Sequence, residues 1–215
     1  MRGPILLTGA AGFVGRQVLK ALLGQSCAVK LVVREGQERA FENIDGIIEV
    51  VSSVDMFAES ASWWENVCTG VDTIIHVAWY AEPGEYLQSP RNLECLKGSL
   101  AIATAGVKVG VRRIFGVGTC FEYDLTGGYL SVATPLNPLT LYAATKAATF
   151  LTLQAYCLTS NVEFGWGRLF YLYGDGEDVR RFVPYVKSKL AAGENAELTS
   201  GHQIRDFMDV ADAGQ

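Results

Sequence analysis

Short apolar runs alternate with longer amphipathic stretches almost to the end of the chain. Runs of Val, Ile and Leu without polar alternation are typical of strands that are buried on both faces. They predict six strands, at residues 4–8, 28–33, 46–51, 71–78, 113–118 and 162–170. The helical stretches between these runs indicate βαβ crossovers, so the pattern predicts an α/β fold with a doubly wound parallel sheet.

Two of the predicted helices, at residues 93–107 and 141–158, are apolar around much of their circumference. A helix that covers one face of a sheet needs only a single apolar stripe. The additional apolar surface indicates either a deeply packed helix or a contact with a second subunit, and the pattern alone leaves both open.

The alternation of strands and helices breaks down after residue 172. Loops, a helix at residues 184–192 and a strand-like patch near residues 196–199 follow, and residues 209–215 read as the opening of a helix. We therefore expect a main domain over residues 1–172 and, over residues 173–215, the start of a small, truncated lobe that binds the substrate.

A glycine-rich turn follows the first predicted strand. Gly9, Gly12 and Gly15 lie between the strand at residues 4–8 and the helix that begins near Val14. In such a turn the first glycine allows a tight bend, the second lets the backbone approach a phosphate, and the third lets the helix pack closely on the strand. The helix N-terminus offers free N–H groups and a partial positive charge. This context predicts a Rossmann-type site for the diphosphate of a dinucleotide, rather than an ordinary turn.

Composition narrows the classes of partner. Hydrophobic residues make up 49% of the 215 residues and the formal net charge is −5, which indicates a folded protein and argues against nucleic acid or a membrane as the main partner. We recognise neither a signal peptide nor an apolar stretch long enough to span a bilayer. The five cysteines form no C-x-x-C pair and the chain has only two histidines, so we expect reduced thiols, a cytoplasmic location and no metal site.

Tyr142 and Lys146 lie four residues apart near the start of a predicted helix, so both side chains lie on one helical face. A tyrosine titrates near pH 10, and a neighbouring ammonium favours its phenolate, which makes this pair a candidate proton shuttle. Thr119 follows the fifth predicted strand, at the edge where open α/β sheets bind ligands. Its hydroxyl can hydrogen-bond a carbonyl or alkoxide whose proton Tyr142 transfers.

With these motifs the chain resembles the extended short-chain dehydrogenase/reductase family, the NAD(P)-dependent nucleotide-sugar epimerases, dehydratases and ketoreductases. The resemblance covers nearly the whole chain and keeps the family's order of motifs. These are Thr8-Gly-Ala-Ala-Gly-Phe-Val-Gly15, His76-Val-Ala78, Gly118-Thr119, Tyr142-x-x-x-Lys146, Arg168-Leu-Phe170, Tyr173-Gly174, Gln203-Ile-Arg-Asp-Phe207 and Val210-x-Asp212.

The resemblance implies a role for each matching residue. Tyr142 is implied as the catalytic acid/base, Lys146 as its electrostatic partner and ribose anchor, and Thr119 as the hydroxyl on the substrate side. Arg205 matches the arginine that holds the nucleotide diphosphate, and Tyr171 lies in the expected sugar pocket. Cofactor contacts are implied for Gly9, Gly12, Phe13, Val14, Gly15, Arg34, Asp55, Ala78, Tyr142, Lys146 and Leu169. Because many family members are homodimers, we also expect a four-helix interface built from the two apolar helices.

Departures from the family pattern reduce the number of reactions of the family that fit this chain. Dehydratases of the family carry an Asp-Glu pair directly after the catalytic threonine, whereas Cys120 and Phe121 follow it here, which disfavours dehydration. Tyr171 replaces the asparagine of the R-x-F-N pattern. The segment from Glu122 to Asp124 would either add polar contacts near the sugar or form a solvated loop.

The helix motif N-x-x-G-T is altered as well. Cys95 stands in place of its asparagine, before Lys97-Gly98-Ser99, which leaves the role of Asn92, one turn earlier, open.

The choice of cofactor depends on the end of the second strand. An acidic residue there binds the ribose 2′-hydroxyl of NAD, whereas an arginine suits the 2′-phosphate of NADP. Arg34 precedes Glu35 at this point, which favours NADP but leaves NAD open. Asp55 matches the residue that contacts the adenine in relatives; a solvated loop carboxylate is the alternative.

Three functions remain in competition. The favoured one is reduction of a nucleotide-linked 4-keto-6-deoxy sugar by NAD(P)H, with Tyr142 transferring the proton. The second is a nucleotide-sugar 4-epimerase that retains NAD and uses the same three residues. The third is a regulator that binds NAD(P) without catalysis, which the presence of Tyr142, Lys146 and Thr119 disfavours.

Overall fold

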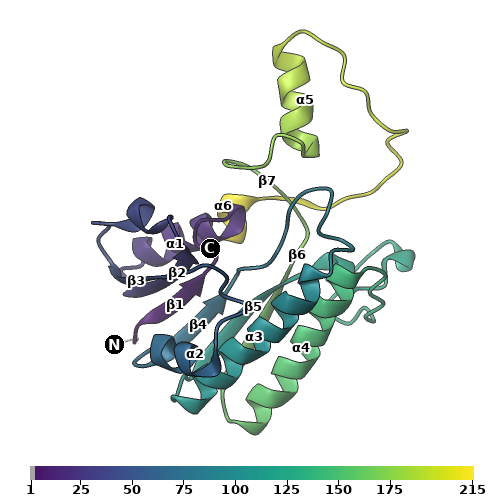
Figure 1. Cartoon of the computed structure of the whole chain (residues 1–215). Coiled ribbons are helices and arrows are strands. Elements are labelled where there is room, and N and C mark those ends of the chain that lie inside the picture. The colour runs from purple at the N-terminus through teal and green to yellow at the C-terminus, as the bar shows by residue number, and fades with distance from the viewer. Residues whose placement is uncertain (1–2) are drawn as a thin grey trace.

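The computed structural model describes residues 3–215, and a parallel sheet of six strands lies at its centre (Figure 1). The strand order is β3-β2-β1-β4-β5-β6. The strands are β1 (Ile5–Thr8), β2 (Val29–Arg34), β3 (Ile47–Ser53), β4 (Thr73–His76), β5 (Arg113–Thr119) and β6 (Glu163–Leu169). This is the doubly wound Rossmann order, in which the direction of winding reverses between β1 and β4. The predicted fold class and all six predicted strands are confirmed.

Helices cover both faces of the sheet (Figure 1). The helices α2 (Ala61–Cys68), α3 (Arg91–Lys108) and α4 (Leu141–Thr159) bury one face around Leu6, Ile74 and Ile114. Helix α1 (Phe13–Gly24) packs on the other face, in a second cluster of buried residues with Leu7, Leu31 and Val33. Burial on both faces is the physical reason why these strands have no polar alternation.

Helix α4 begins at a defined cap. The Thr140 side chain accepts a hydrogen bond from the Ala143 N–H at 3.1 Å, which satisfies one of the free donors of the first turn. This cap fixes the start of the helix, so Tyr142 lies in the first turn and Lys146 one turn later, on the side that faces β5.

The outer faces of α3 and α4 carry exposed apolar side chains, among them Leu93, Leu151 and Leu158. Each of the two helices therefore buries one side in the core and leaves apolar surface on the other. A homodimer through this surface stays a prediction.

The C-terminal part extends from the sheet on a long excursion of the chain (Figure 1). The short strands β7 (Tyr171–Tyr173) and β8 (Phe207–Asp209) pair in parallel, and α5 (Phe182–Ala191) lies between them in sequence. Helix α6 (Val210–Ala213) then returns to α1, where Gly214 packs against Gln17. The division at residue 172 stays a prediction, although it falls inside β7.

One predicted element is wrong. The patch at residues 196–199 forms no strand and lies in a loop with exposed side chains. Its apolar and β-prone residues have no neighbouring strand with which to pair. Three single turns of 3₁₀ helix complete the structure: η1 (Glu38–Phe41), η2 (Cys120–Glu122) and η3 (Leu125–Gly127). Within residues 3–215, no helix combines the length and the apolar character that a bilayer crossing requires; the cytoplasmic location stays a prediction.

Candidate active site

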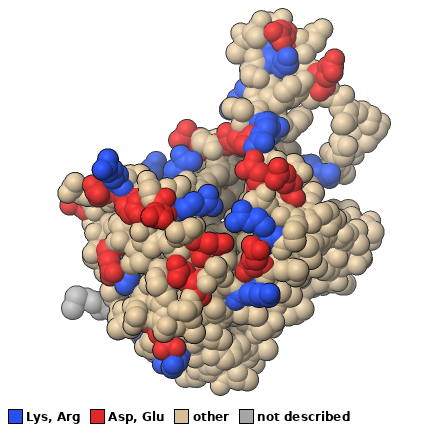
Figure 2. All heavy atoms as spheres, viewed as in Figure 1, with Lys and Arg blue, Asp and Glu red and all other residues tan. Residues whose placement is uncertain are grey.

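A cavity of about 1250 Å³ opens at the carboxyl ends of the parallel strands, where open α/β sheets bind their ligands. Figure 2 shows a hollow on this face that is surrounded by both acidic and basic side chains, below the projecting C-terminal segment. The glycine turn, the ends of β2 and β5, the start of α4 and the loop before β8 all contribute to its wall.

The glycine turn has the geometry that a bound diphosphate requires. Gly9 adopts a φ of +79°, and a Cβ there would lie 2.7 Å from the Ala78 amide nitrogen. A Cβ on Gly15 would overlap the Gly9 carbonyl oxygen, so this glycine allows the close contact between α1 and the turn. Gly12 caps α1 without any side-chain hydrogen bond, and Phe13 lines the cavity beside it. The first N–H groups of α1 are thus available to an anion, and these residues fit the diphosphate of a dinucleotide cofactor.

The end of β2 presents Arg34 to the cavity, whereas Glu35 is not part of the cavity wall. Asp55, beyond β3, also lines the cavity, and its Oδ1 accepts a hydrogen bond from the Phe57 N–H at 3.0 Å. An Arg91 nitrogen lies 4.0 Å from the other carboxylate oxygen of Asp55. Arg34 and Asp55 therefore occupy positions that suit the adenosine half of a dinucleotide.

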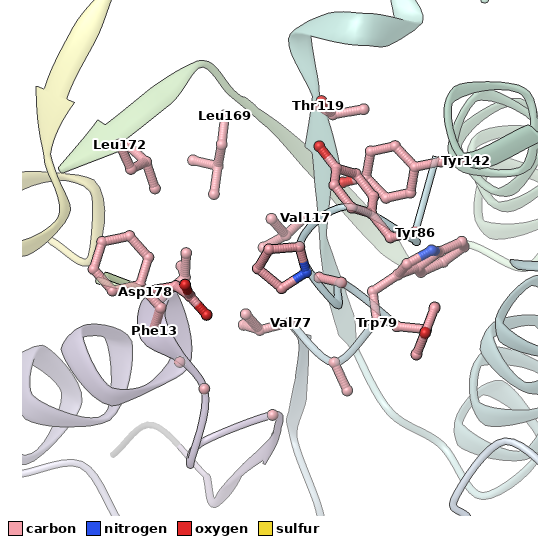
Figure 3. A pocket seen from close by; sticks show the side chains of 18 of the residues that line it. Phe13, Val77, Trp79, Tyr86, Val117, Thr119, Tyr142, Leu169, Leu172 and Asp178 are labelled. Carbon is pink, nitrogen blue, oxygen red and sulfur yellow. The ribbon is translucent and has the colours of Figure 1, made fainter. Parts of the chain in front are cut away.

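The structure brings Tyr142 and Thr119 close together in the wall of the cavity (Figure 3). Burial raises the pKa of Tyr142 above its usual value of 10.0, although the Thr119 hydroxyl beside it favours the phenolate. The ring of Tyr86 meets the Tyr142 ring edge-on at 4.8 Å between centres. The backbone N–H of Tyr142 donates to the Leu87 carbonyl at 3.0 Å, so the loop before α3 fixes the catalytic candidate in place.

Lys146 lies beneath these residues and is almost completely buried. Its ammonium donates to the Val117 carbonyl at 2.6 Å and lies 3.9 Å from the centre of the Trp79 ring. Burial lowers the pKa of Lys146 from 10.5 to about 7, although the charge of Glu122 opposes this change. The ammonium therefore exchanges its proton near neutral pH, in the range where a proton relay operates.

Trp79 and Asn92 were not identified as a pair from the sequence. The Trp79 indole N–H donates to Asn92 Oδ1 at 2.8 Å, and Asn92 Nδ2 donates to the carbonyls of Tyr86 at 2.6 Å and Ser89 at 2.9 Å. Asn92 is fully buried. The open question of its role has a structural answer: Asn92 joins the segment that carries Trp79 to the loop that carries Tyr86.

His76 belongs to the framework of the site. Its Nδ1 lies 2.8 Å from Thr8 Oγ1 and its Nε2 lies 2.8 Å from Ser99 Oγ. Because the Ser99 hydroxyl donates to the Cys95 carbonyl at 2.7 Å, its oxygen accepts from the Nε2–H of His76. Burial lowers the pKa of His76 to about 3, so the imidazole is neutral and links β1, β4 and α3. Among residues 3–215 no group of three or more His, Cys, Asp or Glu side chains is placed to hold a metal ion.

Glu122 differs from both expectations that the sequence raised for its segment. Glu122 neither lines the cavity nor lies in a solvated loop, because its side chain is fully buried and paired with Arg168 at 2.7 Å. Cys120 and Phe121 instead face the cavity beside Thr119. Burial raises the pKa of the Cys120 thiol, which keeps it protonated.

The C-terminal segment contributes aromatic side chains and two cations, Arg181 and Arg205. Tyr171 meets Phe121 edge-on at 6.1 Å between ring centres and Phe207 at 5.6 Å. The Arg205 guanidinium lies 5.1 Å from the centre of the Tyr171 ring, and Leu169 also lines the cavity. The structure thus places all the expected site residues around one cavity; their individual roles stay predictions.

Comparison with known proteins identifies the family. The model of the NAD dependent epimerase/dehydratase family matches residues 5–215. The chain belongs to this family. The resemblance to nucleotide-sugar enzymes that the motifs indicate is therefore confirmed, and the chain is an enzyme of a family that uses NAD and modifies nucleotide sugars.

Individual relatives span several reactions. The chain is 27% identical over 212 residues to dTDP-6-deoxy-L-talose 4-dehydrogenase (NAD(+)) of Aggregatibacter actinomycetemcomitans, covering 97% of this chain and 76% of that protein. It matches MoeE5 in complex with UDP-glucuronic acid and NAD with a TM-score of 0.79 at 26% identity, covering 99% and 70% of the two chains. UDP-N-acetylglucosamine 4-epimerase from Methanobrevibacter ruminantium, in complex with UDP-N-acetylmuramic acid, matches with a TM-score of 0.84 at 20% identity, covering 99% and 71%. The chain spans between about half and three quarters of the length of the relatives that it matches.

Proposed function

We propose that the protein is an NAD(P)-dependent oxidoreductase that reduces the 4-keto group of a nucleotide-linked 6-deoxy sugar. The observation that carries this proposal is the convergence of Tyr142, Thr119 and Lys146 in the cavity at the carboxyl ends of the strands. The cavity also includes the glycine turn, so one opening gives access to both a dinucleotide and a sugar.

The proton chemistry follows from these contacts. A bound nicotinamide would supply the hydride. Thr119 hydrogen-bonds the substrate oxygen and Tyr142 donates a proton to it, while the Lys146 ammonium stabilises the phenolate that forms. Burial raises the pKa of Tyr142, and a neighbouring ammonium favours the phenolate.

The wall beside Thr119 supports a 6-deoxy sugar. Cys120, Phe121 and Tyr171 line the cavity there and offer a thiol and aromatic rings rather than a carboxylate pair. Removal of water from a sugar needs an acid and a base at this point, whereas a methyl group at C6 packs against apolar surface. The 4-dehydrogenase among the relatives acts, by its name, on a dTDP-6-deoxy sugar.

Residues of the same cavity wall support the choice of cofactor and the position of the nucleotide diphosphate. Arg34 faces the cavity and Glu35 does not, which supports NADP over NAD. Arg205 lies at the cavity in a position that suits the diphosphate of the nucleotide sugar. The active assembly is a homodimer, for which the exposed apolar side chains of α3 and α4 provide the contact surface.

A nucleotide-sugar 4-epimerase is the second candidate, because the same three residues serve it and because a 4-epimerase shares the fold. Net cofactor turnover distinguishes the two. A reductase consumes one NAD(P)H for each 4-keto sugar reduced, whereas an epimerase interconverts sugars without net consumption. Turnover of sugar without loss of NAD(P)H absorbance would replace the reductase by the epimerase. Cofactor binding without turnover of any nucleotide sugar would support a regulator.

A further inference from the structure

Glu122 is a buried carboxylate that the proposed chemistry does not use. Its side chain has no exposed surface, yet three donors surround it. Glu122 Oε1 accepts from the backbone N–H of Thr119 at 2.8 Å, and Oε2 accepts from Arg168 Nε at 2.7 Å. The indole N–H of Trp166 lies 3.1 Å and 3.2 Å from the two oxygens. A buried charge is retained only when it is paired and hydrogen-bonded in this way.

The strand β5 is shaped to accept this arrangement. A Cβ on Gly118 would overlap both Trp166 Nε1 and Glu122 Oε1, and a Cβ on Gly116 would overlap the Trp166 ring. The two glycines lie on the same side of β5, because alternate residues of a strand share a face. Gly116, Gly118, Trp166 and Glu122 therefore form one interlocked unit directly behind Thr119.

This unit determines how Thr119 presents its hydroxyl. The backbone N–H of Thr119 is held by Glu122, and the Thr119 oxygen accepts from the Phe121 N–H at 3.3 Å. The hydroxyl hydrogen is then left to point away from the turn, toward Tyr142 or a substrate oxygen. Rotation of the hydroxyl is restricted before the substrate arrives.

The charge of Glu122 also acts on the proton relay. It favours the protonated form of Lys146 and disfavours the phenolate of Tyr142. Other charged or titratable groups lie around Lys146, Tyr142 and Glu122, on the elements that pack against them. These are Arg168 of β6, His76 of β4, Cys95 of α3, Cys120 and Tyr86. Of this set, Glu122 is the anion that opposes the loss of the Lys146 proton.

We propose that Glu122, which Arg168 and Trp166 hold in place, is a positioning residue that fixes the backbone of Thr119 and so orients its hydroxyl toward Tyr142. This inference rests on the proposed function, in which Tyr142, Thr119 and Lys146 act on the sugar. Glu122 itself touches neither substrate nor cofactor.

The test compares Glu122→Gln with Trp166→Phe, which removes one donor to the same carboxylate and leaves the charge. Two titration midpoints are measured: that of the pH profile of kcat/KM, and that of the ¹³C shift of Lys146 Cε in protein without added cofactor, a signal assigned with Lys146→Arg. We expect Glu122→Gln to move both midpoints to lower pH by about one unit. The same variant should lower kcat at least tenfold with little change in KM. Trp166→Phe should keep both midpoints. Parental kcat in folded Glu122→Gln would overturn the inference.

Glu122→Asp provides a second test if the glutamine variant does not fold. The shorter side chain keeps the charge but moves away from the Thr119 N–H. It should keep the Lys146 midpoint and lose kcat at least tenfold, and parental kcat would overturn the positioning role. Tyr142→Phe distinguishes failure of the proposed function from failure of the inference about Glu122. If that variant still turns over, the proposed function fails; if it is inactive while Glu122→Gln and Glu122→Asp behave as the parent, only the inference about Glu122 fails.

Discussion

The ammonium of Lys146 lies 3.9 Å from the centre of the Trp79 indole ring, and both side chains line the cavity. The family resemblance implies a ribose hydroxyl as a partner of this lysine, and in the structure the ammonium contacts the Trp79 ring and the Val117 carbonyl. If Lys146 binds the ribose, we expect Trp79 to compete with the cofactor for the same ammonium.

Removal of the Trp79 ring should strengthen cofactor binding. A desolvated cation–π contact is worth up to about 2 kcal/mol, so Trp79→Leu should lower the Kd of NADH or NADPH by about threefold to thirtyfold. Titration of the nucleotide fluorescence measures this change. Trp63→Leu, on α2 and outside the cavity wall, is the matched control and should leave the Kd unchanged. Weaker binding to Trp79→Leu would show that the indole contacts the cofactor instead.

Tyr142→Phe should abolish turnover while the fold and the cofactor affinity persist. The change removes the transferable proton but keeps the ring that packs against Tyr86. Loss of general acid/base catalysis costs about 10²–10⁴ in rate. Steady-state kinetics with a panel of nucleotide-linked keto sugars measure the loss, and near-UV circular dichroism checks the fold. Activity within tenfold of the parent would remove Tyr142 from the mechanism.

Arg34→Ala should weaken NADPH binding more than NADH binding. A charge-assisted hydrogen bond contributes roughly 1.5–3 kcal/mol, so the ratio of the two Kd values should change by about tenfold or more. Glu35→Ala is the matched control, because Glu35 lies next in sequence but outside the cavity wall. An unchanged ratio in Arg34→Ala, or an equal change in Glu35→Ala, would show that the 2′-phosphate is not recognised by Arg34.

His76 should make the protein sensitive to acid. Its pKa is lowered to about 3 by burial, while an unfolded histidine titrates near 6.5. Between these two values the unfolded chain binds a proton that the folded chain does not, so the unfolding free energy falls as the pH falls, by about 1.4 kcal/mol per pH unit. Urea unfolding at pH 6.5, 6.0 and 5.5 should show a smaller slope in His76→Gln than in the parent. His202→Gln, at an exposed position, should keep the parental slope.

The sequence predicted those features that depend on local patterns. Six apolar runs gave six strands, and Gly9, Gly12 and Gly15 marked the turn, because turn chemistry and burial are properties of adjacent residues. The position of Thr119 and the spacing of Tyr142 and Lys146 also depend on single elements. Their meeting in one cavity follows from the topology of the sheet.

The features that the sequence did not reveal depend on contacts between distant segments. Burial of Glu122 requires the glycines of β5 and the Trp166 indole of β6. Read without these distant partners, the polar residues around position 122 indicate a loop. The signal in the sequence is the pair of glycines at positions 116 and 118. Without side chains there, the strand leaves room for a large neighbour such as Trp166. The patch at residues 196–199 failed for the opposite reason, since β propensity without a partner strand does not make a strand.

The last prediction concerns assembly through α3 and α4. On α4, Thr152 is exposed whereas Ala148 is half-buried, and the apolar Leu151 and Leu158 are exposed on the same helix. A carboxylate placed in an apolar interface must be desolvated without a partner, so Thr152→Glu should dissociate a homodimer and lower its thermal stability. Gln25→Glu adds the same charge at an exposed position beyond the C-terminal end of α1, on the other face of the sheet, and should leave the assembly intact. Light scattering at micromolar concentration measures the mass of each variant. A monomeric parent with full activity would refute the homodimer, and the apolar side chains of α3 and α4 would then be ordinary exposed surface of one domain.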